Sequence, residues 1–154
     1  MTNPILTKLN LGSHERAYVI DAPASFEAVL AEVPADVEVE RSLVEVTGAG
    51  FALAFATTKA QVDTFAEAVG RATVGDAVVW IAYPKSTSRR YTCEFNRDTG
   101  WDTMGAAGFE PVRQVAIDED WSALRFRRAQ YIKNWTRAFA YSEEGRRRLA
   151  ERGS

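Results

Sequence analysis

The chain has 154 residues, of which 46% are hydrophobic and 26% charged, which is the composition of an ordinary globular domain. No run approaches the ~18 consecutive apolar residues of a membrane span, and the first residues lack the basic and apolar regions of a signal peptide. The single cysteine, Cys93, excludes an internal disulfide and suits a reducing compartment. These features predict one cytoplasmic domain without a membrane segment.

The net charge of −2 conceals an uneven distribution along the chain. Residues 1–84 hold 5 basic and 11 acidic side chains, whereas residues 85–154 hold 14 basic and 10 acidic ones. Such a division indicates either a surface that meets an anionic partner or an acidic body that binds its own basic tail.

In chain order, the first predicted element is a strand over residues 17–21. Phe26 and Val29 then begin an apolar series at helical spacing, and Pro34 ends that helix. Residues 37–40 alternate strictly between apolar and acidic side chains, which predicts a half-buried edge strand.

The middle of the chain gives the strongest signals. A continuous apolar run at 51–56 predicts a strand covered on both faces, and a helix follows from Lys59 to about Gly70. Residues 74–76 predict a turn, which leads into the very apolar strand 77–83.

Residues 85–98 are polar and cationic without a clear period, so they are interpreted as a long loop. A short helix is predicted over 101–107. Two strands follow, at 111–117 and 122–127, and the acidic turn 118–120 between them predicts an antiparallel hairpin.

From Ala129 onward the chain is predicted to be helical, with a break near 140–142. Ser142 suits the start of the last helix because a hydroxyl cap and the acids after it favour the positive helix end. Strands interleaved with helices predict a parallel sheet with right-handed crossovers, to which the hairpin adds. We therefore predict an α/β domain over 1–128 and a basic helical tail over 129–154, packed on that domain or extending from it.

The ending of the domain resembles that of class I methyltransferases, in which a strand, a loop, a helix that ends in a Gly-Phe pair such as Gly108-Phe109, and a hairpin follow one another. Residues 77–128 are also similar to a group of small, uncharacterised bacterial proteins of unknown function. That similarity rests on the segments 80–85, 96–98, 111–118 and 120–127. The resemblance implies a three-layer, Rossmann-like fold with a mostly parallel sheet of about six strands, an antiparallel C-terminal hairpin and a C-terminal helical extension. The family implies no activity.

The segment after the first strand departs from a working methyltransferase. Those enzymes have a glycine-rich turn there, because only glycine allows the close approach to the cofactor and the unusual dihedrals. Here residues 21–25 contain no glycine and include Pro23. An acidic residue to hold the cofactor's ribose could only be Glu38 or Glu40, and an alternating edge strand explains both. The sequence thus predicts no cofactor and argues against an enzyme.

Open α/β sheets bind ligands beyond the carboxyl ends of their strands, and arginine and hydroxyl side chains suit phosphate or carboxylate groups. We therefore predict either a site for a small anionic ligand or a merely solvated loop at this edge. The candidate ligand-binding residues are Asp21, Thr57, Thr58, Tyr83, Lys85, Ser86, Arg89, Arg90, Asn96 and Arg97.

No catalytic residues are predicted. His14 is the only histidine and precedes the first strand, so a pair with Cys93 would require chance proximity. No metal site is predicted either, because a single Cys and a single His exclude a zinc cluster and the acids at 118–120 are interpreted as a solvated turn.

The tail offers an alternative, because basic residues interleaved with aromatic ones can bind nucleic acid. Ile132, Trp135 and Phe139 also fit an amphipathic helix that packs on the domain. The candidate nucleic-acid contacts are Arg128, Lys133, Arg137, Arg146, Arg147 and Arg148.

Three functions are carried forward from the sequence. The first is a non-catalytic or regulatory module that binds a small anionic ligand or a protein partner, as a monomer or homodimer. The second is a nucleic-acid-binding protein that uses its tail, and the third is an S-adenosylmethionine-dependent methyltransferase.

Overall fold

A computed structural model of the chain describes residues 3–96, 99–133 and 140–152. Its centre is a six-stranded sheet in the order β2-β1-β3-β4-β6-β5. The first four strands in this order are parallel, and β6 is antiparallel to both β4 and β5. The strands are β1 (Arg16–Ile20), β2 (Glu38–Glu40), β3 (Ala49–Phe55), β4 (Thr73–Pro84), β5 (Phe109–Ala116) and β6 (Trp121–Arg128).

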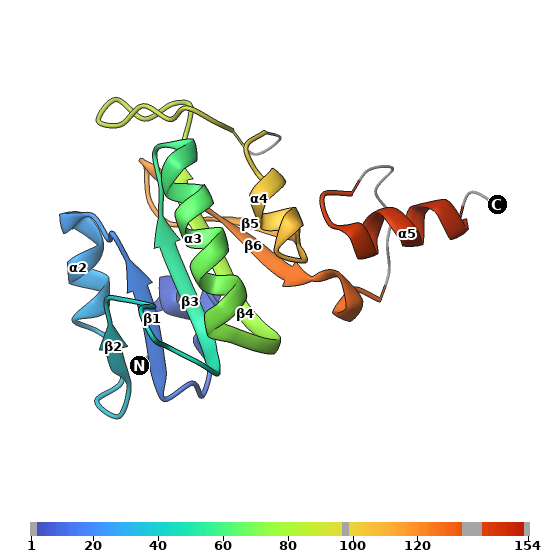
Figure 1. Cartoon of the computed structure of the whole chain (residues 1–154). Helices are drawn as coiled ribbons and strands as arrows, with labels where there is room; N and C mark the ends of the chain where they lie inside the picture. The colour runs from blue at the N-terminus through green and yellow to red at the C-terminus, as the bar shows by residue number, and fades with distance from the viewer. Residues whose placement is uncertain (1–2, 97–98, 134–139, 153–154) are drawn as a thin grey trace.

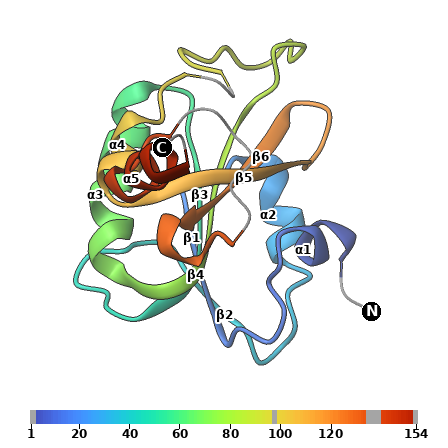
Figure 2. The same ribbon diagram turned by 90° about the vertical axis from the view of Figure 1, so that its right-hand side faces the viewer.

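Helices cover both faces of this sheet, so the fold has three layers. Figure 2 shows α1 (Pro4–Lys8) and α2 (Ala24–Leu30) on one side, and α3 (Lys59–Ala72) and α4 (Asp102–Ala106) on the other. Two buried clusters fill the interfaces: Phe26, Phe55 and Trp80 belong to the α1/α2 side, and Phe65 and Trp101 to the α3/α4 side. The predicted three-layer α/β fold, with a mostly parallel sheet of six strands and an antiparallel C-terminal hairpin, is confirmed.

Local sequence accounts for the central helix. The side chain of Thr58 accepts a hydrogen bond from the amide of Gln61, and the side chain of Gln61 accepts one from the amide of Thr58, which is a capping box. Behind this cap, Val62, Phe65 and Val69 recur at helical spacing and are at most 4% exposed. Burying each such side chain contributes about 1.5–3 kcal/mol, which fixes α3 against β3 and β4.

The predicted turn at 74–76 is wrong, because these residues form the first part of β4. The hydroxyl of Thr73 donates to the carbonyl oxygen of Val69 at 2.6 Å, so the chain leaves α3 and enters the strand at once. Gly75 has a positive φ of 66° inside the strand. A glycine in a sequence can mark an irregularity inside a strand as well as a turn between elements, so Gly75 alone did not distinguish the two.

Two further differences lie at the ends of the chain. The five-residue helix α1 was not expected from the sequence. The tail is not helical from Ala129, since a single 3₁₀ turn over Ala129–Tyr131 (η1) is followed by irregular chain to Lys133. The predicted apolar positions Trp135 and Phe139 lie outside the described residues.

The last helix begins where the sequence indicates. α5 (Glu143–Arg152) starts directly after Ser142, whose hydroxyl accepts a hydrogen bond from the amide of Gly145 at 2.9 Å. Figure 1 shows α5 beside α4, at the far end of the sheet from β2. Among the helices of the described residues, none is long and apolar enough to cross a membrane.

Candidate functional site

The carboxyl ends of the parallel strands carry two neighbouring hollows. The first, here the strand-end cleft, has a volume of about 370 Å³ and lies between the end of β1, residues 41–44 after β2, the end of β3 and one face of α3. Leu43, Val44 and Phe65 give it an apolar wall, and Val44 is 79% exposed at the surface. Concave apolar sites of this size with a few polar groups are typical of small-molecule binding.

Asp21 gives the turn after β1 an unusual backbone. Its φ is 58°, in the left-handed region, and α2 begins three residues later. A non-glycine residue rarely adopts this conformation, although aspartate tolerates it, and such strain is concentrated at functional sites. The dihedral angle that glycine supplies in a cofactor loop is therefore present without glycine, and Asp21 itself lines the strand-end cleft.

An ion pair fixes the segment after β2. The Arg41 guanidinium donates to both carboxylate oxygens of Glu27 on α2, each at 2.7 Å, and this contact lowers the pKa of Glu27. Arg41 also lines the strand-end cleft. Of the two acids considered for a ribose, Glu38 is paired with Arg16 at 3.1 Å, and Glu40 is exposed at the end of β2.

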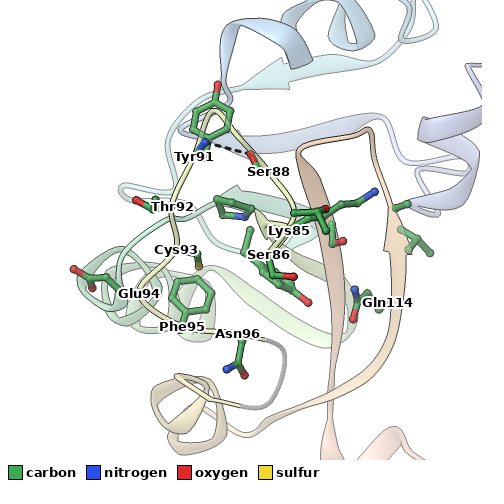
Figure 3. Close-up of a pocket in the computed structure, with 16 residues that line it drawn as sticks. Lys85, Ser86, Ser88, Tyr91, Thr92, Cys93, Glu94, Phe95, Asn96 and Gln114 are labelled. Atoms are coloured by element: carbon green, nitrogen blue, oxygen red, sulfur yellow. Dashed lines mark hydrogen bonds between the residues drawn. The ribbon is translucent and has the colours of Figure 1, made fainter.

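The second hollow, here the loop pocket, is larger, at about 980 Å³. It lies between the end of β4, the loop 85–96 and the β5–β6 hairpin; Figure 3 shows Cys93 and Phe95 on the loop and Gln114 on the hairpin. Tyr83 and Phe95 have ring centroids 5.9 Å apart, and both rings contact the buried Trp101, so the base of the loop pocket is aromatic.

The predicted ligand-binding residues are divided among several places. Tyr83, Lys85, Ser86 and Asn96 line the loop pocket, and Asp21 lines the strand-end cleft. The structure does not gather the predicted cations. Arg89 and Arg90 lie in a separate hollow beside Glu119 and Asp120, and Arg97 lies outside the described residues.

The backbone groups of Thr57 and Thr58 form hydrogen bonds that fix the start of α3. Thr57 and Thr58 both donate their amides to the side chain of Gln61, and the carbonyl of Thr57 accepts from the amide of Glu94 at 3.0 Å. The carboxylate of Glu94 accepts from the amide of Lys59 at 2.9 Å. Since Gln61 lines the strand-end cleft and Glu94 the loop pocket, these contacts form the wall between the two hollows.

The nucleophile and base that the sequence considered lie far apart. Cys93 lines the loop pocket, and burial raises the pKa of its thiol, which disfavours the thiolate. His14 lies near the amino ends of the strands, where its ring packs against that of Phe51 with the ring centroids 6.1 Å apart. In the part of the chain that the structure describes, no three His, Cys, Asp or Glu side chains are grouped to hold a metal ion.

Several of the arginines predicted to contact nucleic acid form hydrogen bonds or ion pairs within the protein itself. Arg128 donates to the carbonyls of Thr73 and Gly75, at 2.8 and 2.9 Å. Arg148 donates to the carbonyl of Ala129 at 3.0 Å, and Arg147 pairs with Glu144 and Glu151. Lys133 and Arg146 are exposed, and Arg137 lies outside the described residues.

The sequence did not indicate three contributors to these hollows: the segment 41–44, the α3 side chain Gln61 and the hairpin residue Gln114. The predicted strand at 37–40 could have indicated the segment 41–44, because the carboxyl end of a parallel β2 must reach the same edge of the sheet as the ends of β1 and β3. Gln114 depends on β5 lying outside β6, which no local pattern reveals.

No family model matches the sequence, and no curated protein matches it. The similarity to small uncharacterised bacterial proteins therefore has no support beyond the fold. A SAM-dependent methyltransferase from Aquifex aeolicus has a similar structure, with a TM-score of 0.60 and 11% identity over 81% of this chain and 88% of that chain. A candidate type 11 methyltransferase from Sulfolobus solfataricus gives 0.50 and 12%, over 87% and 83%. At these identities the likeness shows a methyltransferase-like fold.

Proposed function

We propose that this chain is an S-adenosylmethionine-dependent methyltransferase that holds its cofactor in the strand-end cleft and a methyl acceptor in the loop pocket. The observation that carries the proposal is the left-handed turn at Asp21, which borders an apolar cleft at the carboxyl end of β1. The two methyltransferases of similar structure support the same reading.

The residues of the strand-end cleft fit such a cofactor. Leu43 and Val44 offer apolar surface to a purine ring, while Asp21, Arg41 and Gln61 offer polar groups to the ribose and the amino acid part. When bound, S-adenosylmethionine supplies an electrophilic methyl group. The chain would contribute orientation and exclusion of water, because the loop 85–96 and the hairpin surround the neighbouring pocket on several sides.

Cofactor binding can be tested by blocking the strand-end cleft. Ala60 lines the cleft on α3, and Glu67 is an exposed residue of the same helix that does not line it. Calorimetry with S-adenosylmethionine should give saturable binding to the wild type and to E67W, and no binding to A60W. If the wild type releases no heat at millimolar cofactor, the proposal is wrong.

A second candidate function, a non-catalytic module that binds a small anionic ligand or a partner protein at this edge, is favoured by one observation. The two side chains of the loop pocket that could act as nucleophile or general base are poorly suited to these roles. The pKa of the Cys93 thiol is raised, and the Glu94 carboxylate already accepts a hydrogen bond from the backbone of α3. Lys85 is the cation that such a ligand would meet there.

A screen of sugar phosphates and nucleotides by thermal shift tests this candidate. K85A should abolish a ligand-induced rise of the unfolding midpoint, whereas R90A should preserve it because Arg90 lies outside the loop pocket. Equal shifts in K85A and the wild type would contradict an anion site in the loop pocket. Cofactor binding together with methyl transfer to any acceptor would instead establish the enzyme.

A further inference from the structure

Two arginines lie side by side on the face of the sheet that carries α1 and α2, away from both hollows. Arg113 on β5 is the register partner of Arg125 on β6. Both guanidinium groups lie over the indole of the buried Trp80, at 5.5 and 5.9 Å from the ring centroid. Cation–π contacts of this kind hold the two groups in fixed positions but do not neutralise their charge.

This pair carries an unbalanced positive charge. Like charges directly opposite each other on neighbouring strands are destabilising. Burial, and next the charge of Arg113, lower the pKa of Arg125. Asp76 also acts on Arg125, but both of its carboxylate oxygens accept hydrogen bonds from Arg127, at 2.6 and 2.8 Å.

Within the described residues, neither Arg113 nor Arg125 forms an ion pair with a carboxylate. The Nε of Arg125 is buried and has no hydrogen-bond partner there. Arg16, Arg41 and Arg127, by contrast, each contact an acid. A buried guanidinium donor without an acceptor costs about 1–3 kcal/mol, so its retention calls for an explanation.

The group that joins the two arginines is the neutral side chain of Asn10. Its Oδ1 accepts a hydrogen bond from Arg125 at 3.3 Å and one from Arg113. Asn10 is one of the residues with a left-handed backbone, at a φ of 61°, in the loop after α1. The same loop is fixed by the indole of Trp80, which donates to the carbonyl of Leu9 at 2.7 Å.

We propose that Arg113 and Arg125, with Asn10 at their junction, form a binding site for the phosphate group of a small molecule. A phosphate has enough oxygens to accept from both guanidinium forks at once, whereas a carboxylate has only two. Asn10 provides the complementary side-chain amide. None of these three residues lines either hollow, so the site is separate from the one proposed for methyl transfer.

The test uses the intact chain and inorganic phosphate, at an ionic strength held constant with sodium chloride. Phosphate should raise the unfolding midpoint of the wild type more than acetate or chloride does. R113Q and R125Q should each weaken the apparent affinity at least about tenfold. R16Q removes one positive charge at the β1–β2 edge and should keep the wild-type affinity.

A second measurement does not depend on the folding of the variants. In ¹H–¹⁵N spectra of the wild type, phosphate should shift the Nε–H resonances of Arg113 and Arg125 and leave that of Arg16 unchanged. The proposal is overturned if neither resonance shifts, if phosphate acts no more strongly than acetate, or if R113Q and R125Q respond as the wild type does.

Discussion

A buried carboxylate helps to attach α5 to the sheet, and its removal is a sharp test of the fold. Glu110 on β5 is fully buried. Its carboxylate accepts hydrogen bonds from the amide of Tyr141 at 2.9 Å, and from the amide and the hydroxyl of Ser142 at 2.6 and 2.5 Å. Ser142 is in turn the cap of α5, so the substitution Glu110→Ala removes the acceptor for three donors at the start of that helix.

The magnitude follows from these contacts. Hydrogen bonds to a charged group contribute about 1.5–3 kcal/mol each, and a donor left buried and unpaired costs about 1–3 kcal/mol. Because α5 can move and water can then reach some of the three donors, the full sum is not expected. We expect E110A to lower the free energy of unfolding by about 3 kcal/mol. E110Q keeps one carbonyl acceptor and should lose less.

Urea unfolding measures the change, and amide exchange locates it. The amides of α5 should lose protection in E110A, whereas those of α3 should keep it in proportion to the remaining stability. The exposed Glu67 on α3 provides the control, since E67A should change the free energy of unfolding by less than about 0.5 kcal/mol. A loss within that same limit for E110A, with α5 still protected, would refute the reasoning.

Three further predictions concern single groups. Arg127 lowers the pKa of Asp76, so their ion pair stabilises the native state above the unfolded pKa of Asp76 and loses this effect as the pH falls through the lower native pKa. In urea titrations, D76N should lower the free energy of unfolding by at most about 1 kcal/mol at pH 7, and the difference from the wild type should vanish under strongly acidic conditions. R128M should lower the urea-unfolding free energy by about 2 kcal/mol, because Arg128 donates to the carbonyls of Thr73 and Gly75; stability unchanged from the wild type would contradict this. The thiol of Cys93 should react slowly with iodoacetamide at pH 8 and faster above pH 9, and a fast reaction at pH 7 would show that burial does not raise its pKa.

The sequence predicts most of the sheet because its signals are local. The apolar run at 51–56 and the spacing of Val62, Phe65 and Val69 correspond to β3 and α3. Ser142 marks the start of α5 because a cap is chosen by residues within one turn. The helix α1 was missed because it has only five residues and one buried side chain, Leu6.

What the sequence could not give depends on residues distant in the chain. Whether Arg89 and Arg90 meet a ligand is decided by the hairpin acids Glu119 and Asp120, about thirty positions away, which share their hollow. The place of Gly75 inside β4 is supported by Arg128, which lies 53 positions later in the chain and donates to the carbonyls of Thr73 and Gly75. Neither pattern is visible in a window of neighbouring residues.

The wall between the two hollows also bears on the charge of the ligand. The amino end of a helix attracts anions through its free amides and its dipole, so α3 could have bound a phosphate at the strand edge. Here the chain itself occupies that position, because Glu94 accepts from the amide of Lys59 and the capping box of Thr58 and Gln61 takes two more amides. An anionic ligand at this end of α3 would have to displace a carboxylate of the protein. This arrangement favours a neutral or cationic group over an anionic one beside Glu94 in the loop pocket, where the proposed methyl acceptor would lie. The proposed phosphate site at Arg113 and Arg125 lies on the opposite face of the sheet from α3.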